Sequence, residues 1–143
     1  MEIRALYDLA KQQNIEVLQF PLKDNGSISM MSENGSCYIG MDESVRDGAA
    51  QERVHLGHEL GHCMTGSFYS IHTAIDCRQR HENKADKWAV KKLIPHEDLD
   101  AAIAHGYTQT WELAEYFGVT ETFIKKAVCF YTHGNLATDI YYL

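Results

Sequence analysis

The chain has 143 residues, about one domain's length, with 45% hydrophobic and 23% charged residues, a composition that excludes a disordered or fibrous protein. The formal net charge of −7 disfavours nonspecific attraction to nucleic acid or anionic membranes, because both need clustered positive charge. The N-terminus lacks a signal-peptide pattern and no stretch has the length of a membrane span, so we expect a cytoplasmic protein.

The first third of the chain predicts one helix and three short strands. Residues 2–13 place apolar side chains at helical spacing, which favours an amphipathic helix. The turn at 32–36 contains Asn34 and Gly35, which tolerate the positive φ values of tight turns, so it predicts a hairpin between the last two strands. The three β-rich runs are 16–22, 27–31 and 37–41.

The rest of the chain predicts helices. Residues 44–47 offer capping side chains for a helix that ends near Thr65, followed by Gly66. Four more helices are expected at about 78–93, 96–104, 110–117 and 120–131. No linker separates these pieces, so we predict one α+β domain over residues 1–131 with a small antiparallel sheet, a helical C-terminal subregion at 96–131 and a tail of open role at 132–143.

Four cysteines are scattered through the chain without CxxC spacing: Cys37, Cys63, Cys77 and Cys129. Because a secretory signal is missing, reduced thiols are the better expectation than a disulfide framework. We therefore predict that all four behave as small, buried apolar residues.

The motif His58-Glu59-Leu60-Gly61-His62 predicts a metal site on the helix that ends near Thr65. Two histidines four residues apart lie about 6 Å apart along one helical face, so both imidazoles can converge on one zinc ion. The glutamate between them can take a proton from the attacking water. Gly57 and Gly61 cost helix stability and leave room for another element or a substrate to approach closely.

A zinc peptidase needs a third protein ligand and an open fourth position. On the helix at 78–93, Glu82 and Asp86 point away from the lysine-rich face and toward the core. Buried carboxylates need a cation or hydrogen bonds, so we predict Glu82 as the third ligand and Asp86 as the acceptor for a ring N–H of His58 or His62. For both acids the alternative is a buried salt bridge with Arg53 or another basic side chain.

Other histidines fit the site less well. His55 lies seven residues before His62, about 10.5 Å along the helix axis, too far for both to bind one ion comfortably. Cys77 and His81 also have metal-ligand spacing, so a structural zinc site that uses them with Cys63 is a rival hypothesis.

Three segments of the chain resemble the ImmA/IrrE family of metallo-endopeptidases. They are HELGH at 58–62, ENKADKWAVKKLIP at 82–95, which is similar to the family's second-helix signature, and WELAEYFGVTETFIKKA at 111–127, which is similar to its C-terminal helical pair. The resemblance spans roughly residues 1–131 and implies a compact zincin-like α+β domain. It implies one Zn²⁺ per chain on His58, His62 and Glu82, with Glu59 as the catalytic base.

The same resemblance implies an endopeptidase that cuts a helix-turn-helix repressor of a phage, a mobile element or a stress response. In the expected reaction Glu59 accepts a proton from water and passes it to the leaving amine. Tyr69 and His72, on the connection after the motif helix, are candidates for stabilising the oxyanion. Two alternatives remain: a protein that binds a repressor without cutting it, and a DNA-binding regulator with a structural metal.

Residues 110–129 fit a helix-turn-helix pattern, with small or apolar residues at the packing positions. Direct DNA binding is nevertheless not expected. The segment carries three glutamates against Lys125 and Lys126 and has no arginine for phosphates or guanine edges. We therefore expect these helices to pack or to recognise a protein partner.

Overall fold

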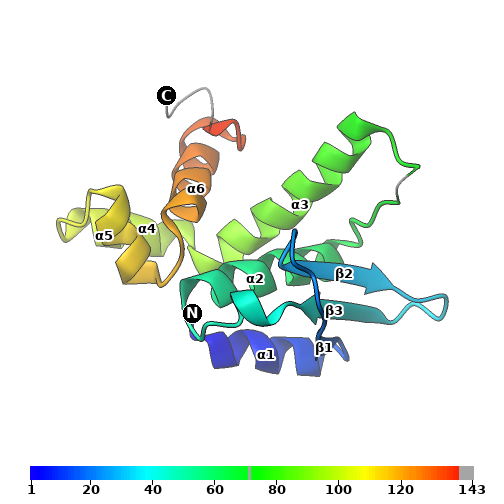
Figure 1. Cartoon of the computed structure of the whole chain (residues 1–143). Coiled ribbons are helices and arrows are strands. Elements are labelled where there is room, and N and C mark those ends of the chain that lie inside the picture. Colours follow the sequence, from blue (N-terminus) through cyan, green and yellow to red (C-terminus); the bar gives the residue numbers. More distant parts are fainter. Residues whose placement is uncertain (71, 139–143) are drawn as a thin grey trace.

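The computed structural model describes residues 1–70 and 72–138 and confirms an α+β fold (Figure 1). Within these residues no helix is both long and apolar enough to span a membrane. In chain order the elements are α1 (Ile3–Gln12), β1 (Glu16–Gln19), β2 (Ser27–Met31), β3 (Cys37–Met41), the 3-10 helix η1 (Glu43–Val45), α2 (Ala50–Thr65), α3 (Ile75–Leu93), α4 (His96–Ala104), α5 (Thr110–Phe117) and α6 (Glu121–His133).

The sheet has the strand order β1-β3-β2 and is mixed. β2 and β3 form the expected antiparallel hairpin, and Gly35 in its turn has a φ of 84°. β1 pairs with β3 in parallel, so the prediction of an antiparallel sheet is wrong for this strand. Successive strands do alternate in direction, but β3 inserts between β1 and β2 and therefore meets β1 with the same polarity. β2 is left as an edge strand.

Helix α2 lies at the centre of the fold, between α1, the sheet and α3 (Figure 1). Its Leu56 and Leu60 are fully buried, together with Ile39 and Met41 of β3. Burial of each such side chain stabilises the fold by about 1.5–3 kcal/mol. The helix that carries the predicted metal ligands is thus held on several sides.

Two glycines let α3 approach α2 closely, as their positions in the motif helix suggested. A Cβ placed on Gly61 would lie 2.4 Å from the carbonyl oxygen of Ala85, which is backbone of α3. A Cβ on Gly57 would meet the end of the Leu93 side chain at 2.9 Å. At Gly61 the backbone of α3 therefore leaves no room for a side chain on α2.

Cys37 and Cys63 form a disulfide, which corrects the prediction that all four cysteines are reduced. Cys37 begins β3 and Cys63 lies in the last turn of α2, and packing of the helix on the sheet brings their Cα atoms to 6.0 Å, within the usual range for a disulfide. Sequence spacing gave no sign of this, because the contact depends on how the helix and the sheet pack. Cys77 and Cys129 are free thiols, and only Cys129 is buried.

The C-terminal helices α4, α5 and α6 gather at the end of α2 and α3 away from the sheet (Figure 1). The Thr120 hydroxyl accepts a hydrogen bond from the backbone N–H of Phe123 and so caps α6. The Tyr131 hydroxyl donates to the carbonyl of Ile94 at 2.7 Å, which fastens α6 to the end of α3. The Tyr131 contact joins the helical subregion to the part of the fold that carries the motif.

Candidate metal centre

Three side chains from α2 and α3 converge on one point. His58 and His62 lie one turn apart on α2, with ring centroids 4.8 Å apart. Glu82 of α3 approaches both: His58 Nε2 lies 2.9 Å from Oε2, and His62 Nε2 lies 3.0 Å from Oε1. Among the described residues these three form the group whose donor atoms, all within 4.8 Å of one another, could hold a metal ion.

The other ring nitrogens of both histidines are engaged. His58 Nδ1 lies 2.7 Å from Asp86 Oδ1, and His62 Nδ1 lies 2.5 Å from the carbonyl oxygen of Ser67. A neutral imidazole has one N–H, which each ring gives to that acceptor, so each Nε2 turns a lone pair toward the Glu82 carboxylate. Such an arrangement is repulsive unless a proton or a metal cation lies between them. The donor set therefore fits a divalent metal.

Electrostatics without a metal show the same demand for a cation. Burial alone would lower the pKa of His58, but hydrogen bonds to Asp86 and Glu82 outweigh it and raise the pKa to about 10. Burial acts to raise the pKa of Glu82, and its hydrogen bonds with His58 and His62 hold it far below the usual range. The negative carboxylates of Glu82 and Asp86 thus stabilise a positive charge between them. Without a metal, the proton on His58 supplies that charge.

Asp86 takes up the predicted place behind His58 and also has a basic partner. Its Oδ2 accepts a hydrogen bond from Lys126 Nζ of α6 at 3.0 Å. The salt-bridge alternative thus coexists with the histidine contact, and Lys126 is the basic partner in place of Arg53. Arg53 instead donates to the carbonyls of Met1 and Gly118.

Glu59, the predicted base, is buried, with 5% of its surface exposed. Its Oε2 accepts a hydrogen bond from the Ser27 hydroxyl at 2.6 Å. Ser27 begins β2 and also contacts His55 Nδ1 at 2.8 Å. Sequence reasoning missed Ser27 because nothing in a strand pattern marks one serine as the partner of a residue 32 positions later.

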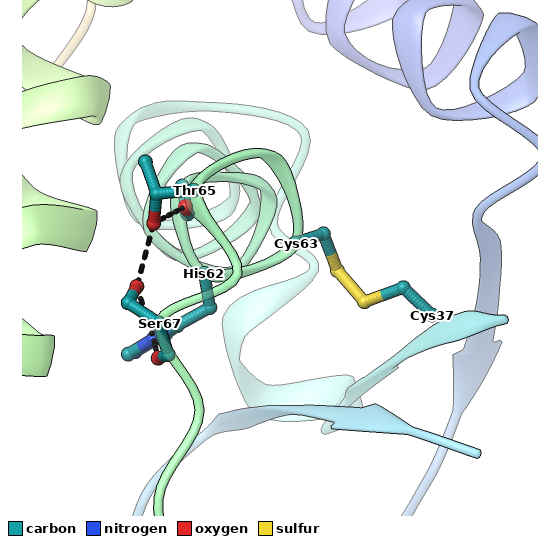
Figure 2. Close-up of a disulfide and its surroundings, with 6 residues drawn as sticks. Cys37, His62, Cys63, Thr65 and Ser67 are labelled. Carbon is teal, nitrogen blue, oxygen red and sulfur yellow. Dashed lines mark hydrogen bonds between the residues drawn. A yellow bond between two sulfur atoms is a disulfide. The ribbon is translucent and has the colours of Figure 1, made fainter. Parts of the chain in front are cut away.

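Ser67, immediately after the helix, was also missed. The C-cap Gly66 has left-handed backbone geometry, with φ of 66°, and turns the chain so that the Ser67 carbonyl meets His62. Figure 2 shows His62 beside Ser67, while Cys63 leaves the same turn of α2 toward Cys37 of β3. One turn of α2 therefore carries a candidate ligand and a covalent link to the sheet.

The convergent residues open into a cleft of about 770 Å³ between β2, α2, α3 and α6. Tyr69 lines it, with its ring centroid 6.4 Å from that of His62, and burial followed by the nearby Glu82 carboxylate raises the pKa of its hydroxyl. His72 is exposed and does not line this cleft. The structure brings the first oxyanion candidate to the site and leaves the second outside it.

The rival site on Cys77, His81 and Cys63 does not form. Cys63 is bonded to Cys37, and Cys77 Sγ instead accepts a contact from Arg80 at 3.3 Å. His81 packs its ring against that of Tyr69 at 6.3 Å. These positions leave the cluster around Glu82 as the candidate metal centre of the described chain.

The site is of the metallopeptidase type. It combines two histidines of an HExxH helix with a glutamate from the next helix, and the buried glutamate of the motif lies between the two histidines in the sequence. Residues 10–128 match the family described as the IrrE N-terminal-like domain, Peptidase_M78. This match covers most of the chain, and the chain therefore belongs to that family of metallopeptidases. A search of the curated proteins found no matching relative.

Proposed function

We propose that the protein is a zinc-dependent endopeptidase that hydrolyses a peptide bond within a protein substrate. The observation that carries this proposal is the convergence of the two Nε2 atoms and the Glu82 carboxylate in a cleft that also contains Glu59. Membership of a metallopeptidase family supports hydrolysis as the reaction.

Zinc is the proposed metal, at one ion per chain. Two imidazole nitrogens and one carboxylate oxygen are the ligand set of many catalytic zinc sites, which keep a fourth position open. When bound, zinc supplies Lewis acidity, which makes a water molecule more acidic and polarises the scissile carbonyl. Asp86 and the Ser67 carbonyl hold the two rings with Nε2 directed at the centre.

The chain's own groups move the proton. Glu59, fixed by Ser27 through Oε2, accepts a proton from the attacking water and returns it to the leaving amine. Tyr69 keeps its proton at neutral pH, as a tyrosine ordinarily does and as its raised pKa further favours, and can donate a hydrogen bond to the developing oxyanion. Tyr69 is 43% exposed, so its ring can adjust to a substrate in the cleft.

An extended segment of a protein is the proposed substrate. β2 is an edge strand of the sheet and borders the cleft, so its outer backbone groups can pair with an added strand next to the metal centre. We propose as its source a helix-turn-helix transcriptional repressor, following the family resemblance, and the reaction would then take place in the cytoplasm. The α5 and α6 pair, slightly acidic, is proposed to recognise protein and not DNA.

The test replaces Glu59 with glutamine, which preserves size and cannot accept the proton. Glu59→Gln should keep its metal and fold and lose about 10²- to 10⁴-fold in hydrolysis rate. Glu97→Gln, the same change at an exposed position of α4, is the matched control and should cleave normally. The substrate should be the product of a neighbouring repressor gene, followed by mass spectrometry of the fragments. If wild type and Glu59→Gln relieve repression equally and neither cleaves, the protein is a non-catalytic binding module.

A further inference from the structure

A chain of two hydrogen bonds joins Glu59 to Ser27 and His55. The Ser27 hydroxyl lies 2.6 Å from Glu59 Oε2 and 2.8 Å from His55 Nδ1. Ser27 and Glu59 are 7% and 5% exposed. The contacts are therefore largely shielded from water. Hydrogen bonds to a charged group are stronger in such a buried environment than in water.

The direction of each hydrogen bond follows from counting protons. A serine hydroxyl has one hydrogen, and a carboxylate can only accept, so Ser27 donates to Glu59. The serine oxygen is then left as the acceptor for His55, which must carry its proton on Nδ1. Burial, the largest influence on this ring, lowers the pKa of His55 and favours its neutral form. The order of donation is therefore His55 to Ser27 to Glu59.

Local backbone geometry makes room for this chain. His55 and Glu59 lie one turn apart on α2, and Ser27 reaches them from the start of β2. The preceding Gly26 has a φ of +79°, and a Cβ there would lie 2.9 Å from His55 Cε1 and 2.8 Å from Val45 Cγ1. Glycine therefore both permits the turn into β2 and leaves space for the imidazole.

We infer that Ser27 and His55 are positioning residues for the general base: they hold Glu59 by Oε2 and leave Oε1 to take the proton. The inference rests on the proposed peptidase function and assigns roles that HExxH alone does not contain. A carboxylate without such a partner can rotate among several rotamers, and only some of them place an oxygen where a water molecule attacks. Ser27 thus acts on the chemical step through Glu59, without touching the substrate's reacting atoms.

Kinetics of Ser27→Ala test the first contact. The variant should keep one metal per chain, lose about 10- to 100-fold in kcat, as expected for a hydrogen bond to a charged group, and keep KM within about twofold. Ser27→Thr, which retains the hydroxyl, should recover most of the rate. Ser36→Ala, in the turn of the same hairpin and outside the cleft, is the matched control. A wild-type kcat in Ser27→Ala, or a loss confined to KM, would overturn the assignment.

The second test needs no activity and separates this inference from the peptidase proposal. Long-range ¹H–¹⁵N NMR of the metal-loaded wild type should find His55 neutral with its proton on Nδ1. In Ser27→Ala the Nδ1 resonance should shift and its proton should exchange faster. A proton on Nε2 in the wild type would refute the hydrogen-bond order even in a fully active enzyme. If the proton is on Nδ1 but the protein cleaves no substrate, the hydrogen-bond order is supported and the proposed peptidase function is refuted.

Discussion

The close approach at Gly61 makes one substitution unusually informative. In Gly61→Ala the new Cβ would lie 2.4 Å from the Ala85 carbonyl oxygen, so the helices must separate by about 1 Å to restore an ordinary van der Waals distance. The obstacle is backbone, which cannot rotate away. Overpacking of this kind costs about 3 kcal/mol, and alanine returns about 1 kcal/mol through its helix propensity. We expect a net loss of about 2 kcal/mol in the free energy of unfolding.

The same displacement should reach the metal centre. Glu82 lies one turn before Ala85 on α3, so a shift of about 1 Å moves its carboxylate away from the histidines of α2. Metal–ligand distances tolerate only about 0.2 Å. The affinity for zinc should therefore fall at least about tenfold.

Urea unfolding of the metal-free proteins and competition with a chromophoric chelator measure the two effects separately. Gly57→Ala is the matched control, because its one contact closer than 3.4 Å is with Cδ1 at the end of the Leu93 side chain and not with backbone. It should unfold within about 0.5 kcal/mol of wild type and keep its zinc affinity. If Gly61→Ala equals Gly57→Ala in both measurements, the backbone contact does not set the helix spacing and the reasoning fails.

Three further predictions concern metal uptake, the disulfide and a helix cap. Zinc must displace the proton held by His58, whose pKa is about 10 without metal, so affinity should rise with pH up to that value; calorimetry at pH 7 in buffers of different ionisation enthalpy should detect about one released proton. Cys37→Ser opens a covalent loop of 26 residues and should lower the free energy of unfolding by about 3 kcal/mol relative to the oxidised wild type, with no difference when both are reduced. Thr120→Ala removes the acceptor for the Phe123 N–H and should cost about 1 kcal/mol in thermal unfolding, while Thr120→Ser should cost less.

Local spacing was enough to predict the parts of the site that lie on one helix. The four-residue separation of His58 and His62 places both on one face wherever the helix lies. The prediction of Glu82 as a ligand followed from the lysines of its own helix, which lie on the opposite face. Those lysines identify the core-facing side of the helix without any knowledge of which helix packs against it. The hairpin at Asn34 and Gly35 was equally local.

Features that depend on packing between distant segments were missed. Ser27 and Lys126 reach the centre from β2 and α6, and neither residue type nor spacing distinguishes them from other serines and lysines of the chain. The Cys37–Cys63 bond and the parallel pairing of β1 have the same cause. Each is set by which surfaces meet, and periodicity within one element contains no information about that.

The disulfide has a consequence for the metal through thermodynamic reciprocity. It restrains the turn of α2 that also carries His62. If the disulfide favours the metal-binding conformation of that turn, then bound metal must favour the disulfide by the same free energy. The coupling free energy between disulfide formation and metal binding is reciprocal. Zinc-loaded protein should therefore resist reduction by a dithiol more than metal-free protein does, and reduction should weaken zinc binding by the same factor. Metal affinity would then report on the thiol–disulfide balance around the protein.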